Sequence, residues 1–254
     1  MLFRARPEFF HRLTRASIPE IAYRLRQHLT GYFLKYALKV NKIPLRVPEI
    51  DFSDVKALQL PELKCGVNLE AIQKLVRGET FRLNADESDI RRFETKYRDA
   101  FFADIHHSSE NPDIRAVWEP ARLQHATLMF LQASKTKDPE NTNALYGAAK
   151  KAVLVWIRQN PFLFGPHYLS AMECGLRVYS FFHCLKARRN LAEQEIKKIA
   201  EAIYFHGWWI YRRRSLYASL GNHTICEAAG LVFAGAVCRK TAEGDRWLKE
   251  GVKL

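Results

Sequence analysis

The segment DPENTNALYGAAKKAVLVWIRQN, residues 138–160, decides the fold class of this chain. Asp138 is a residue type favoured at helix N-caps, and Pro139 follows it at the first helical position, where a backbone N–H would lack an intrahelical partner. Apolar residues then recur every three to four positions as far as Trp156. This period is that of an amphipathic helix, and the segment therefore predicts one helix over residues 139–159.

The same period continues on both sides of this segment. It predicts helices over about 118–135, 168–188, 191–216, 223–239 and 242–250, and a shorter one near 68–77, whereas residues 79–112 give no clear pattern. Strand signals are scarce, so the predicted fold class is all-α. Short loops predict that consecutive helices pair as antiparallel hairpins. Such hairpins build either a solenoid or a closed α/α toroid, and the period does not distinguish the two.

The composition describes a basic globular chain. Of its 254 residues, 48% are apolar, and 40 Lys and Arg against 27 Asp and Glu give a formal net charge of +13. This charge attracts polyanions such as nucleic acid, anionic lipid or acidic polysaccharide, unless it is only a solvated surface. The five cysteines include no C-x-x-C pair, which argues against a disulfide framework or a zinc ribbon. We expect buried free thiols.

The N-terminal residues show no secretory or membrane-spanning pattern. Arginines interrupt every apolar run in residues 1–27, and no stretch of the chain has eighteen uninterrupted apolar residues. The sequence therefore predicts a cytoplasmic chain without a transmembrane helix. Ser17 and Glu20 have capping-box spacing before a helix with one apolar face, formed by Ile18, Ile21, Ala22, Leu25, Leu29, Tyr32, Phe33 and Tyr36. This face either lies on a membrane or, in the simpler interpretation, packs against the rest of the protein.

Residues 216–237, LYASLGNHTICEAAGLVFAGAV, place polar residues at the start of an apolar helix. Asn222 stands where an N-cap is expected, which is a structural reason for an asparagine there. That reason does not explain His223, the next residue. Together with the backbone N–H groups of a helix N-terminus, Asn222 and His223 would form a receptor for a carboxylate.

Two further segments combine aromatic and charged residues. Residues 160–182 contain His167 and Tyr168 before a predicted helix, on which Glu173 and Arg177 have the spacing of an ion pair. Residues 204–217 place Trp208 and Trp209 beside Arg212, which suits sugars with carboxylates, nucleotides, or a basic turn over a packed core. His106 and His107 have no further ligand at metal-binding spacing, so we expect no metal and no cofactor.

Four separated segments together resemble a known family. Residues 113–133, 156–185, 206–237 and 244–254 are similar, in order, to the N-terminal helical domain of heparinase II/III-type polysaccharide lyases. The resemblance covers about residues 70–254. It is most specific in the W-E-x-x-R-L-Q-H element from Trp118, the N-P…G element from Asn160 and the N-H-x-x-x-E-A-A-G-L element from Asn222.

The resemblance implies a fold and an activity. It implies an incomplete α/α toroid that is followed in the family by a β-sandwich, and the cleavage of uronic-acid polysaccharides by β-elimination. It assigns the uronate carboxylate to Asn222 and a neutralising or basic role to His223. The family's catalytic tyrosine and a later histidine lie further along the chain than Leu254, as does its β-sandwich, so we expect half of a lyase site.

These observations define the prediction for the chain. Residues 1–64 would form a basic amphipathic helix and a proline-marked connector, and residues 65–254 the helical toroid domain. Glu227 would support the site, and the groove would be lined by Trp118, Tyr168, Arg177, Trp209 and Arg212. The expected partner is an acidic polysaccharide or oligosaccharide, and not nucleic acid. A non-catalytic glycan-binding module and a basic helix protein that binds nucleic acid or anionic membranes remain as alternatives; the sequence does not indicate an oligomeric state.

Overall fold

The computed structural model describes residues 16–39, 47–50, 55, 74, 86–105, 111–187, 191–217 and 220–254. The chain divides into two compact units, Met1–Arg46 and Val47–Leu254. The described residues are helical and contain no strand, only one isolated bridge between Phe101 and Phe164. The predicted all-α class is confirmed for this part of the chain. Of the predicted helix at 68–77 only residue 74 is described, and the predicted boundary at residue 64 lies outside the described residues.

The first unit contains one described helix, α2 (Ile18–Lys39). The Glu20 backbone N–H donates to Ser17 Oγ at 3.4 Å, which is half of the predicted capping box. Within this unit, taken by itself, the side chains of the apolar face are exposed, from Ile18 at 84% to Tyr36 at 67%. Both interpretations of this face stay predictions, because the two units are described separately.

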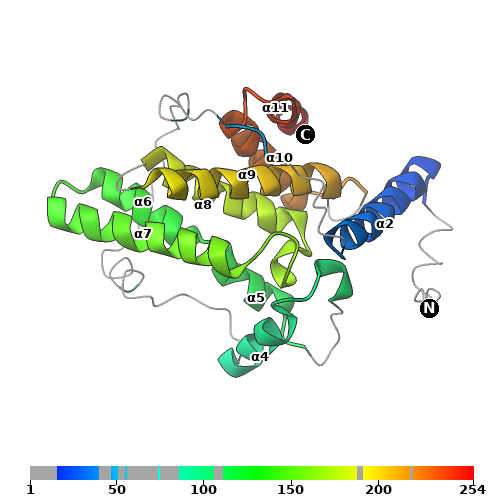
Figure 1. Ribbon diagram of the computed structural model, residues 1–254, viewed down its shortest axis with the longest axis horizontal. Helices are drawn as coiled ribbons and strands as arrows, with labels where there is room; N and C mark the ends of the chain where they lie inside the picture. Colours follow the sequence, from blue (N-terminus) through cyan, green and yellow to red (C-terminus); the bar gives the residue numbers. More distant parts are fainter. Residues whose placement is uncertain are drawn as a thin grey trace. The chain divides into compact units, whose positions relative to one another are not determined.

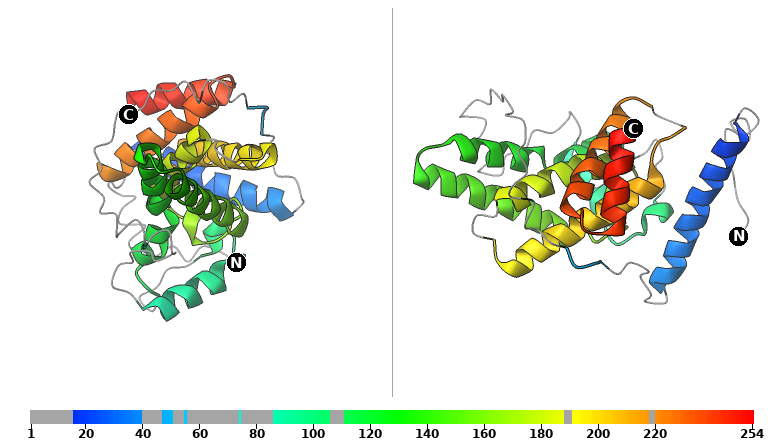
Figure 2. Two further views of the ribbon diagram at one scale, coloured as in Figure 1. Left: turned by 90° about the vertical axis from the view of Figure 1, so that its left-hand side faces the viewer. Right: turned by 90° about the horizontal axis from the view of Figure 1, so that it is seen from above.

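The second unit begins with short elements and continues with long helices. Its elements are α4 (Glu87–Tyr97), η2 (Phe102–Asp104), α5 (Ile114–Ala121), α6 (Gln124–Lys135), α7 (Pro139–Gln159), η3 (Pro166–Tyr168), α8 (Ala171–Ala187), α9 (Glu193–Arg213), α10 (Asn222–Val237) and α11 (Ala242–Lys253). Consecutive helices pack as α6 with α7, α8 with α9, and α10 with α11, and α8 also packs against α10. Figure 1 shows α6 beside α7, and Figure 2 shows α10 beside α11.

Helix α7 begins and ends where the sequence predicts. The Asp138 carboxylate accepts hydrogen bonds from the Glu140 and Asn141 backbone N–H groups at 3.2 and 3.3 Å, and Pro139 occupies the first turn. The cap satisfies donors that have no intrahelical acceptor. The ends of α8 to α11 lie within three residues of their predictions.

The helix predicted over 118–135 is two helices. Leu123 has a left-handed backbone with φ 58°, which separates α5 from α6. The Ser180 hydroxyl on α8 contacts the carbonyl oxygens of Leu123 and Arg122 at 3.0 and 3.2 Å. A side chain from a distant helix thus provides the polar contacts at this break.

Helices α8 and α10 approach each other closely at two glycines. A Cβ atom on Gly175 would lie 2.3 Å from the Cys226 carbonyl oxygen, and one on Gly230 would lie 2.6 Å from the Gly175 Cα atom. Only glycine fits this crossing without movement of the backbone. The contact brings the first half of α10 against the first half of α8.

Candidate functional site

Helix α10 starts at Asn222, and the preceding Gly221 occupies the cap position. Gly221 has φ 93° and the cap makes no side-chain hydrogen bond, so the expectation that Asn222 is the N-cap is wrong. The first intrahelical bond runs from the Ile225 backbone N–H to the Gly221 carbonyl at 3.0 Å. Asn222 is exposed and His223 is half-buried. Capping therefore does not account for the asparagine, whose amide lies at the positive end of a helix.

Glu227 fixes the first half of α10 to the segment after α9. Its side chain is 1% exposed and accepts hydrogen bonds from the Ser215 backbone N–H at 2.7 Å and from the Ser215 hydroxyl at 2.8 Å. Burial raises the pKa of Glu227, while the Ser215 hydrogen bonds and the charges of His223 and Arg214 oppose that rise. Glu227 thus occupies a supporting position one helical turn after His223.

An ion pair between the half-buried Arg122 and the buried Glu173 lies against the same part of α10. The Arg122 guanidinium donates from Nε and Nη2 to the two oxygens of Glu173, both at 2.9 Å. The pKa of Arg122 is raised chiefly by its hydrogen bonds to Glu173. The pKa of Cys226 is raised by burial and by Glu173 and lowered by Arg122, which places this thiol beside the pair.

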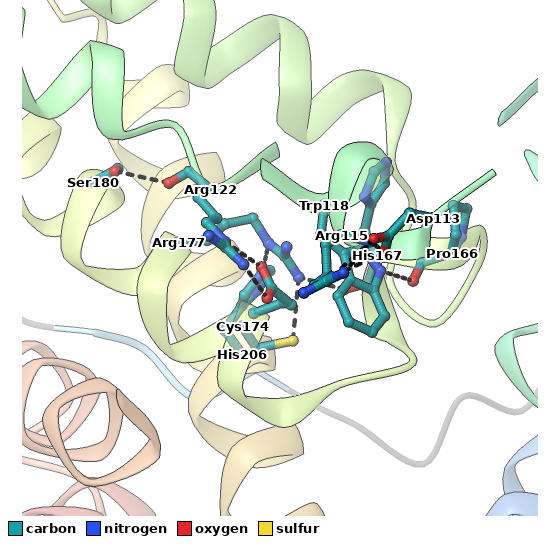
Figure 3. Close-up of polar contacts among 11 residues, drawn as sticks. Asp113, Arg115, Trp118, Arg122, Pro166, His167, Cys174, Arg177, Ser180 and His206 are labelled. Carbon is teal, nitrogen blue, oxygen red and sulfur yellow. Dashed lines mark hydrogen bonds and ion pairs between the residues drawn. The ribbon is translucent and has the colours of Figure 1, made fainter. Parts of the chain in front are cut away.

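Arg177 forms a second polar cluster deeper in the helical unit. Its side chain is fully buried and donates to His206 Nε2 at 3.2 Å, to the His167 carbonyl and to Cys174 Sγ at 3.3 Å (Figure 3). The guanidinium carbon lies 4.7 Å from the centre of the Trp156 ring. The spacing of Glu173 and Arg177 suggested a pair, but each side chain has a different partner. Arg177 is held by uncharged groups and an aromatic ring.

The histidines around Arg177 are held neutral. Burial, and then the charge of Arg177, lower the pKa of His167 to about 3 and that of His206 well below its ordinary value. His206 Nδ1 lies 2.8 Å from the Ala202 carbonyl oxygen, so Nδ1 carries the proton and Nε2 accepts from Arg177. This cluster joins α8, α9 and η3, and Arg177, His206 and His167 are all buried in it.

Three of the five residues expected to line a groove are buried. Tyr168, Arg177 and Trp209 are at most 2% exposed, and the Trp209 indole donates to the Tyr168 carbonyl at 3.1 Å. The Trp118 indole donates to the Pro166 carbonyl at 2.9 Å (Figure 3), which connects α5 to η3. Tyr168, Arg177 and Trp209 are thus packed inside the helical unit, and their contact with a polysaccharide stays a prediction.

Arg212 remains at the surface of the basic segment. It is half-buried, and its guanidinium lies 3.9 Å from the centre of the Trp208 ring. Stacking on an aromatic ring fixes the direction of the cation, and Nη1 also donates to the Trp208 carbonyl at 3.5 Å. Of the predicted lining residues, Trp118 and Arg212 are the two that retain exposed surface.

A cavity of about 160 Å³ lies between α7, η3 and α9. Its lining includes Trp156, Tyr168 and His206, together with Lys198 and Glu201, but neither Asn222 nor His223. It is therefore not the concave surface expected around those two residues.

Sequence reasoning did not select Arg122, Ser215 or Cys226, and it considered Glu173 only as a partner of Arg177. Arg122 is the arginine of the W-E-x-x-R element, which was a signal in the sequence. Its partner Glu173 lies on α8, 51 positions further along the chain. His106 and His107 lie outside the described residues. Within the described ranges, no group of three or more His, Cys, Asp and Glu side chains is placed to hold a metal ion. No helix in the same ranges has the length and apolar content of a membrane span.

Comparisons with known proteins add no family assignment. No protein-family model, curated protein or solved structure matches this chain.

Proposed function

We propose that this chain contains the helical domain of a heparinase II/III-type polysaccharide lyase and that Asn222 and His223 recognise a uronate carboxylate. In this proposal the helix pairs of Val47–Leu254 belong to an incomplete α/α toroid. The observation that carries the proposal is the start of α10, where an exposed Asn222 occupies a helix N-terminus that Gly221, not the asparagine, caps.

The contacts between the motif segments support this assignment. Trp118 and Arg122 of the W-E-x-x-R element contact Pro166 and Glu173, which follow the N-P element in sequence. Glu227, in the N-H-x-x-x-E element, holds Ser215 and lies one turn after His223. The elements that carry the resemblance are thus in contact with one another or with the first half of α10.

The chemistry of β-elimination requires such a receptor. A base removes the C5 proton of the uronate, the C4–O4 bond breaks, a C4–C5 double bond forms, and the departing O4 takes a proton. The C5 proton is too weakly acidic while the neighbouring carboxylate keeps its full charge. Donors placed on the carboxylate stabilise the charge that develops there. In our proposal the Asn222 amide, the His223 ring and the backbone N–H groups at the start of α10 are those donors.

The test is binding of uronic-acid oligosaccharides of heparan, hyaluronan and alginate type, measured by calorimetry at constant salt. A hydrogen bond to a charged group is worth about 1.5–3 kcal/mol, so Asn222→Ala should weaken binding about tenfold or more. Asn143→Ala is the matched control, since Asn143 is an exposed asparagine on α7. Unchanged binding in Asn222→Ala would refute the assigned role.

Two further arms separate this proposal from the other candidate functions. Binding of neutral oligosaccharides of equal length with equal affinity would indicate a sugar site that does not read the carboxylate. Tighter binding of RNA, with an affinity that falls steeply as salt rises, would indicate a general polyanion surface. Ultraviolet absorbance of the unsaturated product reports lyase turnover in the same samples and would distinguish a lyase from a binding module.

A further inference from the structure

The cavity between α7, η3 and α9 has walls of aromatic rings. Among the described residues, the rings that line it are those of Trp156, Phe162, Tyr168, Phe205 and His206. Phe162 and Phe205 stack with their ring centres 4.9 Å apart, and Phe162 meets Tyr168 edge to face at 5.5 Å. All of these side chains belong to Val47–Leu254, so the cavity is described within one unit.

The polar atoms of two of these rings are used inside the protein. The Tyr168 hydroxyl donates to the Asn160 carbonyl at 3.3 Å. His206 Nδ1 donates to the Ala202 carbonyl at 2.8 Å, and its Nε2 accepts from Arg177 at 3.2 Å. These walls therefore offer a ligand mainly the apolar surface of their rings.

Two opposite charges accompany the aromatic walls. Lys198 and Glu201, both on α9, are the charged side chains among the described residues that line the cavity. A lysine and a glutamate three positions apart on a helix can pair with each other. Within the described ranges, however, neither side chain takes part in an ion pair. A cation and a carboxylate thus lie beside the same cavity, and neither is neutralised by a protein group there.

We propose that this cavity binds a free aromatic α-amino acid. In this proposal the ligand ring lies among Trp156, Phe162 and Phe205, the ligand carboxylate binds Lys198, and the ligand ammonium group binds Glu201. An engineered apolar cavity of about 150 Å³ in another protein takes up benzene. The cavity of about 160 Å³ is therefore large enough for one aromatic ring, with the charged groups of the ligand at the Lys198 and Glu201 side.

The charges favour a zwitterion over simpler ring compounds. A neutral ring compound leaves both Lys198 and Glu201 without a partner. An aromatic acid pairs with Lys198 but is repelled by Glu201, and an aromatic amine has the opposite problem. An α-amino acid carries both charges on adjacent groups and satisfies both side chains, and a few such polar contacts fix the orientation of a ligand in an apolar pocket.

This inference does not depend on the proposed lyase function, because Asn222 and His223 do not line the cavity. The test is calorimetric titration of the 254-residue chain with L-phenylalanine and three relatives. The relatives are 3-phenylpropionate, which lacks the ammonium group, 2-phenylethylamine, which lacks the carboxylate, and L-alanine, which lacks the ring. We expect L-phenylalanine to bind at least fivefold more tightly than each relative.

Substitution of the two charges should change this preference in opposite directions. Lys198→Gln and Glu201→Gln should each weaken L-phenylalanine binding about fivefold or more, since each removes a charged hydrogen bond. Lys198→Gln should strengthen binding of 2-phenylethylamine, and Glu201→Gln should strengthen binding of 3-phenylpropionate, because a repelling charge is removed. Lys197→Gln and Glu193→Gln are the controls, since both residues are exposed on α9 and do not line the cavity. Circular dichroism checks that the helices are retained.

Three results would overturn the proposal. One is the absence of L-phenylalanine binding to the unchanged chain. Another is equal affinity for L-phenylalanine and the neutral benzyl alcohol, which would mean that the cavity takes up rings without reading the charges. The third is L-phenylalanine binding that is the same in Lys198→Gln, Glu201→Gln and the two controls, which would place the bound ligand elsewhere.

Discussion

At the scale of single residues, the half-buried Arg122 and the fully buried Arg177 are compensated in different ways. Arg122 is neutralised by the fully buried Glu173 through two parallel hydrogen bonds. Arg177 instead contacts uncharged groups, namely His206, the His167 carbonyl and the Trp156 ring. Removal of either partner of a buried pair leaves a charge without compensation, which is more costly than loss of the attraction itself.

We therefore expect Arg122→Ala to lower the free energy of unfolding by about 3–5 kcal/mol, because Glu173 would remain buried without its partner. The control is Arg92→Ala on α4, whose ion pair with Asp89 has side chains 78% and 44% exposed. Exposed pairs are worth about 0–1 kcal/mol, so this variant should be nearly neutral. Urea unfolding followed by circular dichroism measures both. Equal losses in the two variants would contradict the assigned role of the Arg122–Glu173 pair.

At the scale of helices, the crossing of α8 and α10 depends on the absence of side chains at Gly175 and Gly230. The crossing places Cys226 of α10 beside the Arg122–Glu173 pair. It thereby determines where the start of α10, with Asn222 and His223, lies relative to α8. A helix register set by close backbone contact cannot shift by a small amount without loss of packing.

Substitution at this crossing should be strongly destabilising, whereas the same change on an open helix face should not. Gly175→Ala places a methyl group on the Cys226 carbonyl and should cost about 1–3 kcal/mol or more. Gly147→Ala on α7, where nothing lies within 4 Å of the added atom, should stabilise the protein by about 0.5–1 kcal/mol. Thermal unfolding of both variants gives the comparison. A stabilised Gly175→Ala protein would show that the two helices are not in close contact.

At the scale of the whole molecule, the buried histidines make stability depend on pH. Burial lowers the pKa of His167 to about 3 and that of His183 to about 4, and it lowers that of His206 well below 6.5. In the unfolded chain these side chains bind protons below about pH 6.5. The unfolded state then binds more protons than the folded state, so stability falls as pH decreases from about 6.5 toward 4.

The contribution of one of these histidines can be isolated by substitution. Each neutral histidine contributes at most about 1.4 kcal/mol per pH unit to the slope of unfolding free energy against pH. His206→Gln should remove about that amount from the slope between pH 4 and 6, whatever its effect on stability at neutral pH. Asn143→Ala, at an exposed position on α7 that carries no titrating group, should leave the slope unchanged. Urea unfolding at a series of pH values measures the slopes, and identical slopes for His206→Gln and the unchanged chain would contradict this account.

What the sequence determined by itself is local. Asp138 and Pro139 determine the cap and first turn of α7, and the apolar period determines the helical class and the approximate ends of α8 to α11. Both act locally, because backbone hydrogen bonds and capping join residues only a few positions apart.

The tertiary structure decided what depends on distant residues. The break at Leu123 is supported by Ser180, Glu173 binds Arg122 and not Arg177, and the predicted groove residues Tyr168, Arg177 and Trp209 are buried. The period of a helix shows which side is apolar but not which residues cover it, because burial depends on what distant parts of the chain place against that side.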